Sequence, residues 1–190
     1  MKKFCYSLLM ILPFLFLNVD AAFAQHIFLK AGELTAKGSL IKGYENYIEI
    51  TGVQFGAEAE SSYTKGGGAS VGKPSFDVIS ITKNVDKLSN ELLKNIAAGK
   101  SIPLIEIATT ARPQQGSELV VHKIELKNVF VTKISDASAG CDDCGTLAES
   151  VSFVYKAIRI TTYSQDAKTG VFSANPNPFE LDIPTLNPEF

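Results

Sequence analysis

Short apolar runs separated by turn residues make up most of the chain after residue 25. The runs are rich in Val, Ile, Phe, Tyr and Thr, which is typical of an all-β domain. Apolar and charged residues alternate strictly over 123–127, so Ile124 and Leu126 share one face of a strand and three charged residues share the other. Strands with one buried face are therefore predicted. We expect them at residues 26–30, 46–55, 76–83, 102–110, 118–134 and 148–163.

The last predicted strand changes the phase of its apolar positions. Val151 and Phe153 share one phase, whereas Ile158 and Ile160 occupy the other. Because side chains alternate along a strand, we expect a bulge or bend near Lys156. A bend of this kind suits a barrel better than a flat sheet.

One segment has helical periodicity. Leu92, Leu93 and Ile96 recur at spacings of three and four, which predicts an apolar helix face that includes Leu93. Ser89 is the expected N-cap residue, and Gly99 is expected to end the helix. A helix of about ten residues is marginal alone, so we expect its apolar face to pack over the sheet.

Two stretches lack this regular alternation. Residues 61–74 contain three consecutive glycines and few apolar residues, which predicts a mobile loop or an extended hairpin. The tail from about residue 175 to 190 contains four prolines, so we expect it to be extended, with Phe179, Leu181 and Ile183 in a last edge strand.

Residues 1–24 have the order of a signal peptide. Two lysines precede sixteen uncharged residues, and Ala22 and Ala24 are small residues at the positions that signal peptidase inspects. Sixteen residues fall short of the roughly 20 that span a bilayer. We therefore expect cleavage between Ala24 and Gln25, which leaves one domain at 25–190; an uncleaved membrane anchor is the alternative.

Composition narrows the function. The 190 residues carry a net charge of -2 and no basic stripe, which disfavours nucleic acid as a partner. The segment 67–73 has the spacing of a phosphate-binding loop, but Pro74 stands where Ser or Thr would bind magnesium. The sequence therefore indicates no cofactor and no catalytic or metal-binding residues, and it predicts a protein that is not an enzyme.

Cys141 and Cys144 flank two aspartates. In an exported chain a short structural disulfide is favoured, because the compartment is oxidising. Two alternatives stay open: a redox pair, which the intervening carboxylates would oppose, and a zinc site completed by His26 and His122.

Several short motifs resemble the haemolysin-coregulated protein (Hcp) family, the tube subunits of bacterial type VI secretion systems. The central motifs are Ile81-Thr82-Lys83, Asp86-Lys87-Leu88-Ser89, Leu92-Leu93, Gly99-Lys100 and Ile102-Pro103, and the flanking ones are Phe28-Leu29-Lys30, Val53-Gln54-Phe55-Gly56 and Glu149-Ser150-Val151-Ser152-Phe153. The resemblance extends from about residue 28 to 163. It implies a compact β-barrel of two sheets with one helix at its side.

The same resemblance implies how the protein works. Family members form hexameric rings that stack into a hollow tube, carry no catalytic residues, and can hold effector proteins. The region of Gly66, Gly67, Gly68 and Lys73 resembles the segment that contacts a stacked ring. The leader implies that the protein is secreted or periplasmic and has no membrane partner after cleavage. If the leader is unused, the protein is expected to be cytoplasmic before secretion. A monomeric exported barrel that binds another protein is the alternative.

The cysteine pair gives a first test. Protein exported from its native host should contain no free thiol at Cys141 and Cys144, because the pair is oxidised. Alkylation without reductant should then leave both unmodified in the mass spectrum, and alkylation after reduction should modify both. Two thiols alkylated without reductant would reject the disulfide.

Overall fold

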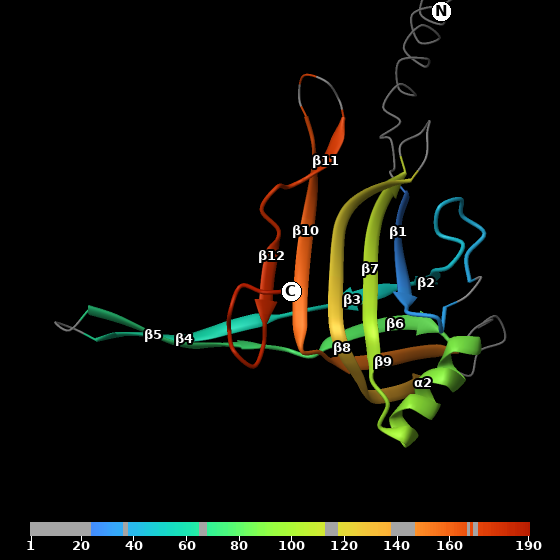
Figure 1. The fold of residues 1–190 in the computed structure, drawn as a ribbon, viewed down its shortest axis with the longest axis horizontal. Helices are drawn as coiled ribbons and strands as arrows, with labels where there is room; N and C mark the ends of the chain where they lie inside the picture. Colours follow the sequence, from blue (N-terminus) through green and yellow to red (C-terminus); the bar gives the residue numbers. More distant parts are fainter. Residues whose placement is uncertain are drawn as a thin grey trace, which may run out of the picture.

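The computed structural model describes residues 24–35, 38–64, 68–112, 118–137, 147–166, 168 and 171–190. The strands and the helix follow one another as β1 (Ala24–Ala31), β2 (Ile48–Ile50), β3 (Gly52–Gln54), β4 (Ala57–Thr64), β5 (Gly68–Phe76), β6 (Ile79–Asn84), α2 (Lys87–Ala98), β7 (Ile102–Arg112), β8 (Leu119–Ala137), β9 (Ala148–Val154), β10 (Ala157–Gln165), β11 (Phe172–Ala174) and β12 (Phe179–Asp182). Figure 1 shows α2 at one side of the strands and a long hairpin of β4 and β5 projecting from the other. The fold is mainly β, as the alternation predicts.

The strands close into a barrel. Their order is β2-β1-β7-β8-β9-β6-β3, and the two end strands are consecutive in the chain, separated only by Thr51. The Thr51 amide and hydroxyl both donate to the Thr82 carbonyl, at 2.8 and 3.0 Å, which ties the break between β2 and β3 to β6. Closure removes most of the unpaired edges that an open sheet would expose. The single strand predicted over 46–55 is therefore two strands that turn at Thr51.

Strand β8 belongs to both sheets of this barrel. Its first part pairs with β7 and β10, and its last part pairs with β9. Asn128 has a φ of 50° at the point where β8 changes partners. This left-handed conformation is one that Asn tolerates better than most residues, and it lets one strand serve two sheets.

The predicted bend near Lys156 is confirmed. Strands β9 and β10 run one after the other along β8 and are interrupted only at Tyr155 and Lys156. The Lys156 amide donates to the Lys127 carbonyl at 3.0 Å, which keeps the interruption attached to β8. Phe153 and Ile158 are both fully buried, although an odd and an even position would face opposite sides of one continuous strand. The interruption at Tyr155 and Lys156 lets both side chains enter the core.

The core lies inside the barrel and matches the alternation. Ile124 and Leu126 are 3% and 0% exposed, whereas Lys123 and Glu125 on the opposite face are partly exposed. The largest fully buried apolar side chains of this core come from β1, β6, β7, β8, β9, β10 and α2: Leu29, Ile79, Ile81, Leu92, Ile105, Ile107, Leu126, Phe153 and Ile158. Phe28 is also fully buried, but it lies on the other face of β1 and stacks on Tyr44 with ring centroids 4.2 Å apart.

Helix α2 begins earlier than the sequence predicts. Asp86, not Ser89, is the N-cap, and Ser89 is the N3 partner of a capping box. Gly99 ends the helix as predicted, with a φ of 60°. Within the described ranges, no helix combines the length and apolar character needed to cross a bilayer.

The early start changes which helix face is buried. Leu88 and Leu92 are 3% and 0% exposed, whereas Leu93 and Ile96 are 48% and 38% exposed. The prediction that Leu93 is buried is therefore wrong. Leu88 lies in the first helical turn, four residues before Leu92, so the two side chains share the buried face. Leu93 lies about 100° around the helix axis from Leu92 and therefore points away from that face. The buried stripe packs against β8.

One irregular stretch has a structure that the sequence allowed, and the other is extended only in part, because the chain turns over residues 183–186 and Ile183 lies outside the last strand. The extended hairpin, rather than a mobile loop, is formed by β4 and β5, so Phe76 belongs to β5 and not to β6. Strand β12 is the predicted edge strand of the tail and pairs with β10. The short strand β11, which pairs with the end of β10, was not predicted.

Two neighbouring leucines test the helix placement. Leu92→Ala should lower the free energy of unfolding by about 2–5 kcal/mol, because it leaves a cavity under the helix. Leu93→Ala should lower it by about 0.5 kcal/mol, because that side chain is half exposed. Urea denaturation of both variants measures the difference. Equal losses would contradict the buried stripe described above.

Candidate functional site

A buried lysine joins helix α2 to the strands β6 and β9. The Lys83 side chain is 0% exposed and that of Glu149 is 1% exposed, with 2.9 Å between Lys83 Nζ and Glu149 Oε2. The two residues stand directly opposite each other in the β6–β9 ladder. Lys83 Nζ also donates to Asp86 Oδ1 at 2.7 Å and to Ser89 Oγ at 2.9 Å. An ammonium group is therefore held at the N-terminus of the helix without contact with solvent.

The remaining polar atoms around Lys83 are also hydrogen-bonded. Ser89 Oγ donates to Glu149 Oε2 at 2.8 Å and accepts from the Asp86 amide at 3.1 Å. Asp86 Oδ1 accepts from the Leu88 amide at 2.9 Å. We call Lys83, Asp86, Ser89 and Glu149 the lysine network. Buried charges of this kind are tolerated only when every partner is in place, so the network is a structural lock between helix and sheet.

The family-signature residues divide between this lock and the helix ends. Asp86 is in the network, Leu92 is buried beside it, and Lys87 and Leu93 are exposed. At the other end the Gly99 amide donates to the Ile96 carbonyl at 3.2 Å and the Lys100 amide to the Asn95 carbonyl at 3.0 Å. These two bonds satisfy carbonyls that would otherwise be unpaired at the end of the helix.

Glu149 is the network member whose role sequence reasoning missed. The signal was present, because Glu149 shares its strand phase with the buried Val151 and Phe153. Lys83 likewise shares its phase with Ile79 and Ile81. A charged residue on the apolar face of each of two strands indicates a buried ion pair.

The hairpin of β4 and β5 is anchored at its base. The rings of Phe76 and Phe179 stack with centroids 6.2 Å apart, which joins the hairpin to β12. The Tyr155 hydroxyl donates to the Asp77 carbonyl at 3.1 Å, and the Asp77 amide donates to the Gly56 carbonyl at 3.0 Å. The base thus fixes the direction in which the hairpin projects (Figure 1).

Beyond its base the hairpin exposes a polar surface. The hydroxyls of Ser62 and Ser70 hydrogen-bond across the strands at 2.9 Å. Lys73 is exposed, and Val71 is an apolar side chain that is 71% exposed. Of the predicted ring-stacking residues, Gly68 and Lys73 lie in β5, whereas Gly66 and Gly67 lie outside the described residues.

Alternating charges cross the outer face of the barrel. The successive pairs join β1, β7, β8, β10 and β12: Lys30–Glu106 at 3.6 Å, Glu106–Lys123 at 3.0 Å, Lys123–Glu125 at 3.1 Å, Glu125–Arg159 at 3.7 Å and Arg159–Glu180 at 2.6 Å. Burial raises the pKa of Glu106, but the hydrogen bond and charge of Lys123 outweigh it, so the net pKa is lowered. Burial, followed by the charge of Glu106, raises the pKa of Tyr47 to about 12. Each charged group lies beside one of opposite sign, so this face lacks the continuous positive potential that would attract a polyanion.

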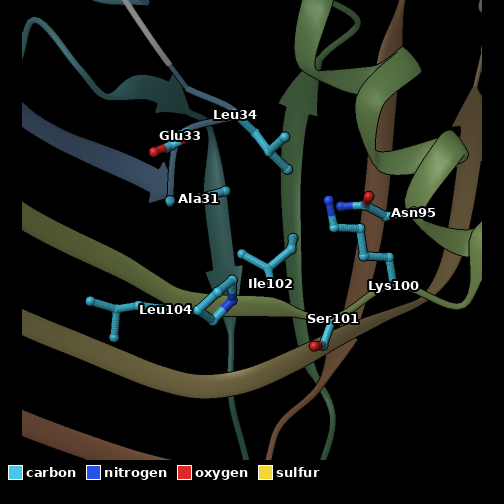
Figure 2. A pocket seen from close by; sticks show the side chains of 10 residues that line it. Ala31, Glu33, Leu34, Asn95, Lys100, Ser101, Ile102 and Leu104 are labelled. Carbon is cyan, nitrogen blue, oxygen red and sulfur yellow. The ribbon is translucent and has the colours of Figure 1, made fainter.

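A mainly apolar pocket lies between the end of β1, the start of β7 and the C-terminal end of α2. Its volume is about 370 Å³. Figure 2 shows Ala31, Leu34, Ile102 and Leu104 on one side, and Lys100 near the end of the helix. The lining offers space for an apolar side chain but no paired acid and base.

The two histidines have separate surroundings. His26 Nδ1 lies 2.6 Å from Glu49 Oε1, and its Nε2 lies 3.9 Å from Glu118 Oε1. Burial lowers the pKa of His122 in β8. Among the residues that the structure describes, no group of three or more His, Cys, Asp or Glu side chains could hold a metal ion. Cys141 and Cys144 lie outside the described residues, so their disulfide stays a prediction.

Removing only the lysine of the lysine network should destabilise the protein more than replacing both Lys83 and Glu149. Lys83→Met should cost about 3–5 kcal/mol of unfolding free energy, because Glu149 is left buried without its cation. Adding Glu149→Leu should recover most of the loss, since an apolar pair of similar volume tolerates burial.

An exposed ion pair serves as the control for that experiment. Lys94 Nζ lies 2.6 Å from Glu91 Oε1, with the side chains 69% and 43% exposed, so Lys94→Met should cost less than about 1 kcal/mol. Denaturant titration of the single and double variants measures these differences. A double variant less stable than Lys83→Met alone would contradict the lock.

Known proteins with a similar sequence profile or a similar fold include type VI secretion proteins. The family profile described as "Type VI secretion system effector, Hcp" matches residues 28–162. A solved structure described as a type six secretion system protein is 23% identical with a TM-score of 0.72, covering 86% of this chain and 99% of that chain. Hcp1 from Salmonella typhimurium is 20% identical with a TM-score of 0.64, covering 86% and 98%.

Hcp1 from E. coli EAEC 042 is similar at 18% identity and a TM-score of 0.60, covering 81% of this chain and 98% of that chain. Among curated proteins, none matches the sequence. The identities to the solved structures are low, so these structures establish the fold alone. The family profile extends over most of the chain and includes α2 with the whole lysine network, and by this match the chain belongs to the Hcp family of type VI secretion system tube proteins.

Proposed function

We propose that the chain is a structural, non-enzymatic tube subunit that forms homohexameric rings, stacks them into a hollow tube and holds secreted effector proteins inside. The observation that carries this proposal is the family match over residues 28–162. The arrangement of charges agrees with it, because the ionisable groups of the outer face are paired with one another rather than aimed at a reacting atom.

The shape of the subunit supports head-to-tail assembly. The hairpin of β4 and β5 projects from one side of the barrel, while α2 lies at the opposite side (Figure 1). Two different surfaces at opposite sides favour heterologous contacts, and such contacts close into a ring when the rotation per subunit allows it. The half-exposed Leu93 and Ile96 of α2 would be covered by this kind of contact.

The outer part of the hairpin is the proposed contact between stacked rings. It includes Gly66, Gly67, Gly68 and Lys73. Its anchored base gives the hairpin a fixed direction, and its exposed hydroxyls and charges suit a polar contact that is made after the subunit has folded.

The leader adds a proposal about location. Cleavage between Ala24 and Gln25 would release the domain 25–190 to the periplasm or the exterior. Strand β1 begins at Ala24, so the proposed cleavage site lies at the first residues of the barrel. If the leader is unused, the chain is cytoplasmic before the secretion system exports it. Cell fractionation with intact-mass measurement distinguishes these routes.

One second function is favoured by the leader. A subunit exported singly through a signal peptide would miss a tube that assembles in the cytoplasm. The alternative function is therefore an exported monomeric barrel that binds another protein through its surface, with the same fold and the same lysine network.

A shortened hairpin tests the proposed stacking contact. Replacing residues 60–73 by Asn-Gly should close β4 onto β5 with a two-residue turn and leave the barrel intact. We expect hexameric rings to persist while stacked tubes disappear from sedimentation profiles and electron micrographs. Lys73→Ala, with the hairpin kept at full length, is the milder variant.

Two controls define the outcome of this experiment. The melting temperature of the shortened variant should stay near that of the parent, which shows that the barrel is folded. Tubes that form equally well without residues 60–73 would refute the stacking role of the hairpin.

A further inference from the structure

We propose that Gln25 is a modification site: once cleavage after Ala24 makes it the first residue, its side chain cyclises onto its own α-amine to give pyroglutamate. This inference rests on the leader removal described under the proposed function. It adds a specific chemical form of the mature N-terminus, which the family match does not supply.

The chemistry needs only groups that Gln25 itself carries. The free α-amine attacks the side-chain carboxamide carbon, a new C–N bond closes a five-membered lactam, and the bond to the amide nitrogen breaks as ammonia leaves. No oxidant, reductant or second substrate takes part. Before cleavage the same nitrogen is a peptide nitrogen with little nucleophilic character, because its lone pair is delocalised into the carbonyl. The reaction is therefore confined to the cleaved chain.

The structure leaves Gln25 room to react. Gln25 is exposed and lies opposite Ala111 of β7 on one edge of β1. On the other edge, pairing with β2 begins only at Ile27, which stands opposite Ile50. The Gln25 side chain lines an open hollow together with Glu49 and Thr51, so the carboxamide can fold back without displacing the buried core.

The lactam also changes the charge at the start of the barrel. A free α-ammonium on residue 25 would add a positive charge at the strand end that shares this hollow with Glu49. Cyclisation removes that positive charge but keeps one N–H donor at the strand end. The mature chain then begins without a terminal charge, and its first peptide bond is closed to aminopeptidases.

Intact-mass spectrometry of exported protein tests the proposal. The full chain, residues 1–190, is expressed with its own leader in a bacterial host and collected from the exported fraction. We expect a species that corresponds to residues 25–190 less the mass of one ammonia, a shift of about 17 Da that accompanies loss of the terminal charge. N-terminal sequencing of this species should be blocked.

Two variants serve as matched controls. Gln25→Asn would need a strained four-membered ring to close onto its α-amine, and Gln25→Ala has no carboxamide, so both should be cleaved and retain an open amine that N-terminal sequencing reads. Gln25→Ala should also show no loss of ammonia. A cleaved wild-type chain with an open Gln25 amine would overturn the pyroglutamate while leaving leader removal intact. Exported protein that begins at Met1 would overturn leader removal and, with it, this modification.

Discussion

The buried ammonium group of Lys83 is the constraint on which the helix and one sheet of the barrel depend. A lysine without solvent contact is strongly destabilising unless each hydrogen reaches an acceptor. Here the acceptors come from the Asn84 carbonyl, from Asp86 and Ser89 of the helix start, and from Glu149 of β9. This one charge therefore links the register of β6 against β9, in which Lys83 stands opposite Glu149, to the start of α2.

The lock leaves the two ends of the subunit free for assembly. The barrel closes through Thr51 and its core is filled from inside, so the described residues of the outer hairpin and of the outer helix face contribute no buried apolar side chain to that core. Val71 on the hairpin and Leu93 and Ile96 on the helix stay exposed. A folded subunit with apolar residues exposed at opposite sides fits the tube role of the family, and the paired charges on the remaining face keep that face neutral.

Much of this fold could be predicted from the alternation of residues, and the failures have local causes. Ile124 and Leu126 set the buried face of β8 correctly, and the phase change near Lys156 marked a real interruption. The prediction that Leu93 is buried fails because the N-cap is Asp86 and not Ser89, so the helix begins three residues earlier than expected. Asn128 could not be identified, because its left-handed backbone is required by strands that are distant in the sequence. All four residues of the lysine network stand in the short family motifs, but the pairing of their charges depends on strand register that no motif states.

Self-assembly distinguishes the proposed tube subunit from a single exported barrel. Static light scattering of the exported, leader-free protein over a wide concentration range tests it most directly. Closed cyclic assembly predicts a particle of about six protomer masses, with larger stacked species as the concentration rises. A strict monomer at the highest concentration reached would contradict the account.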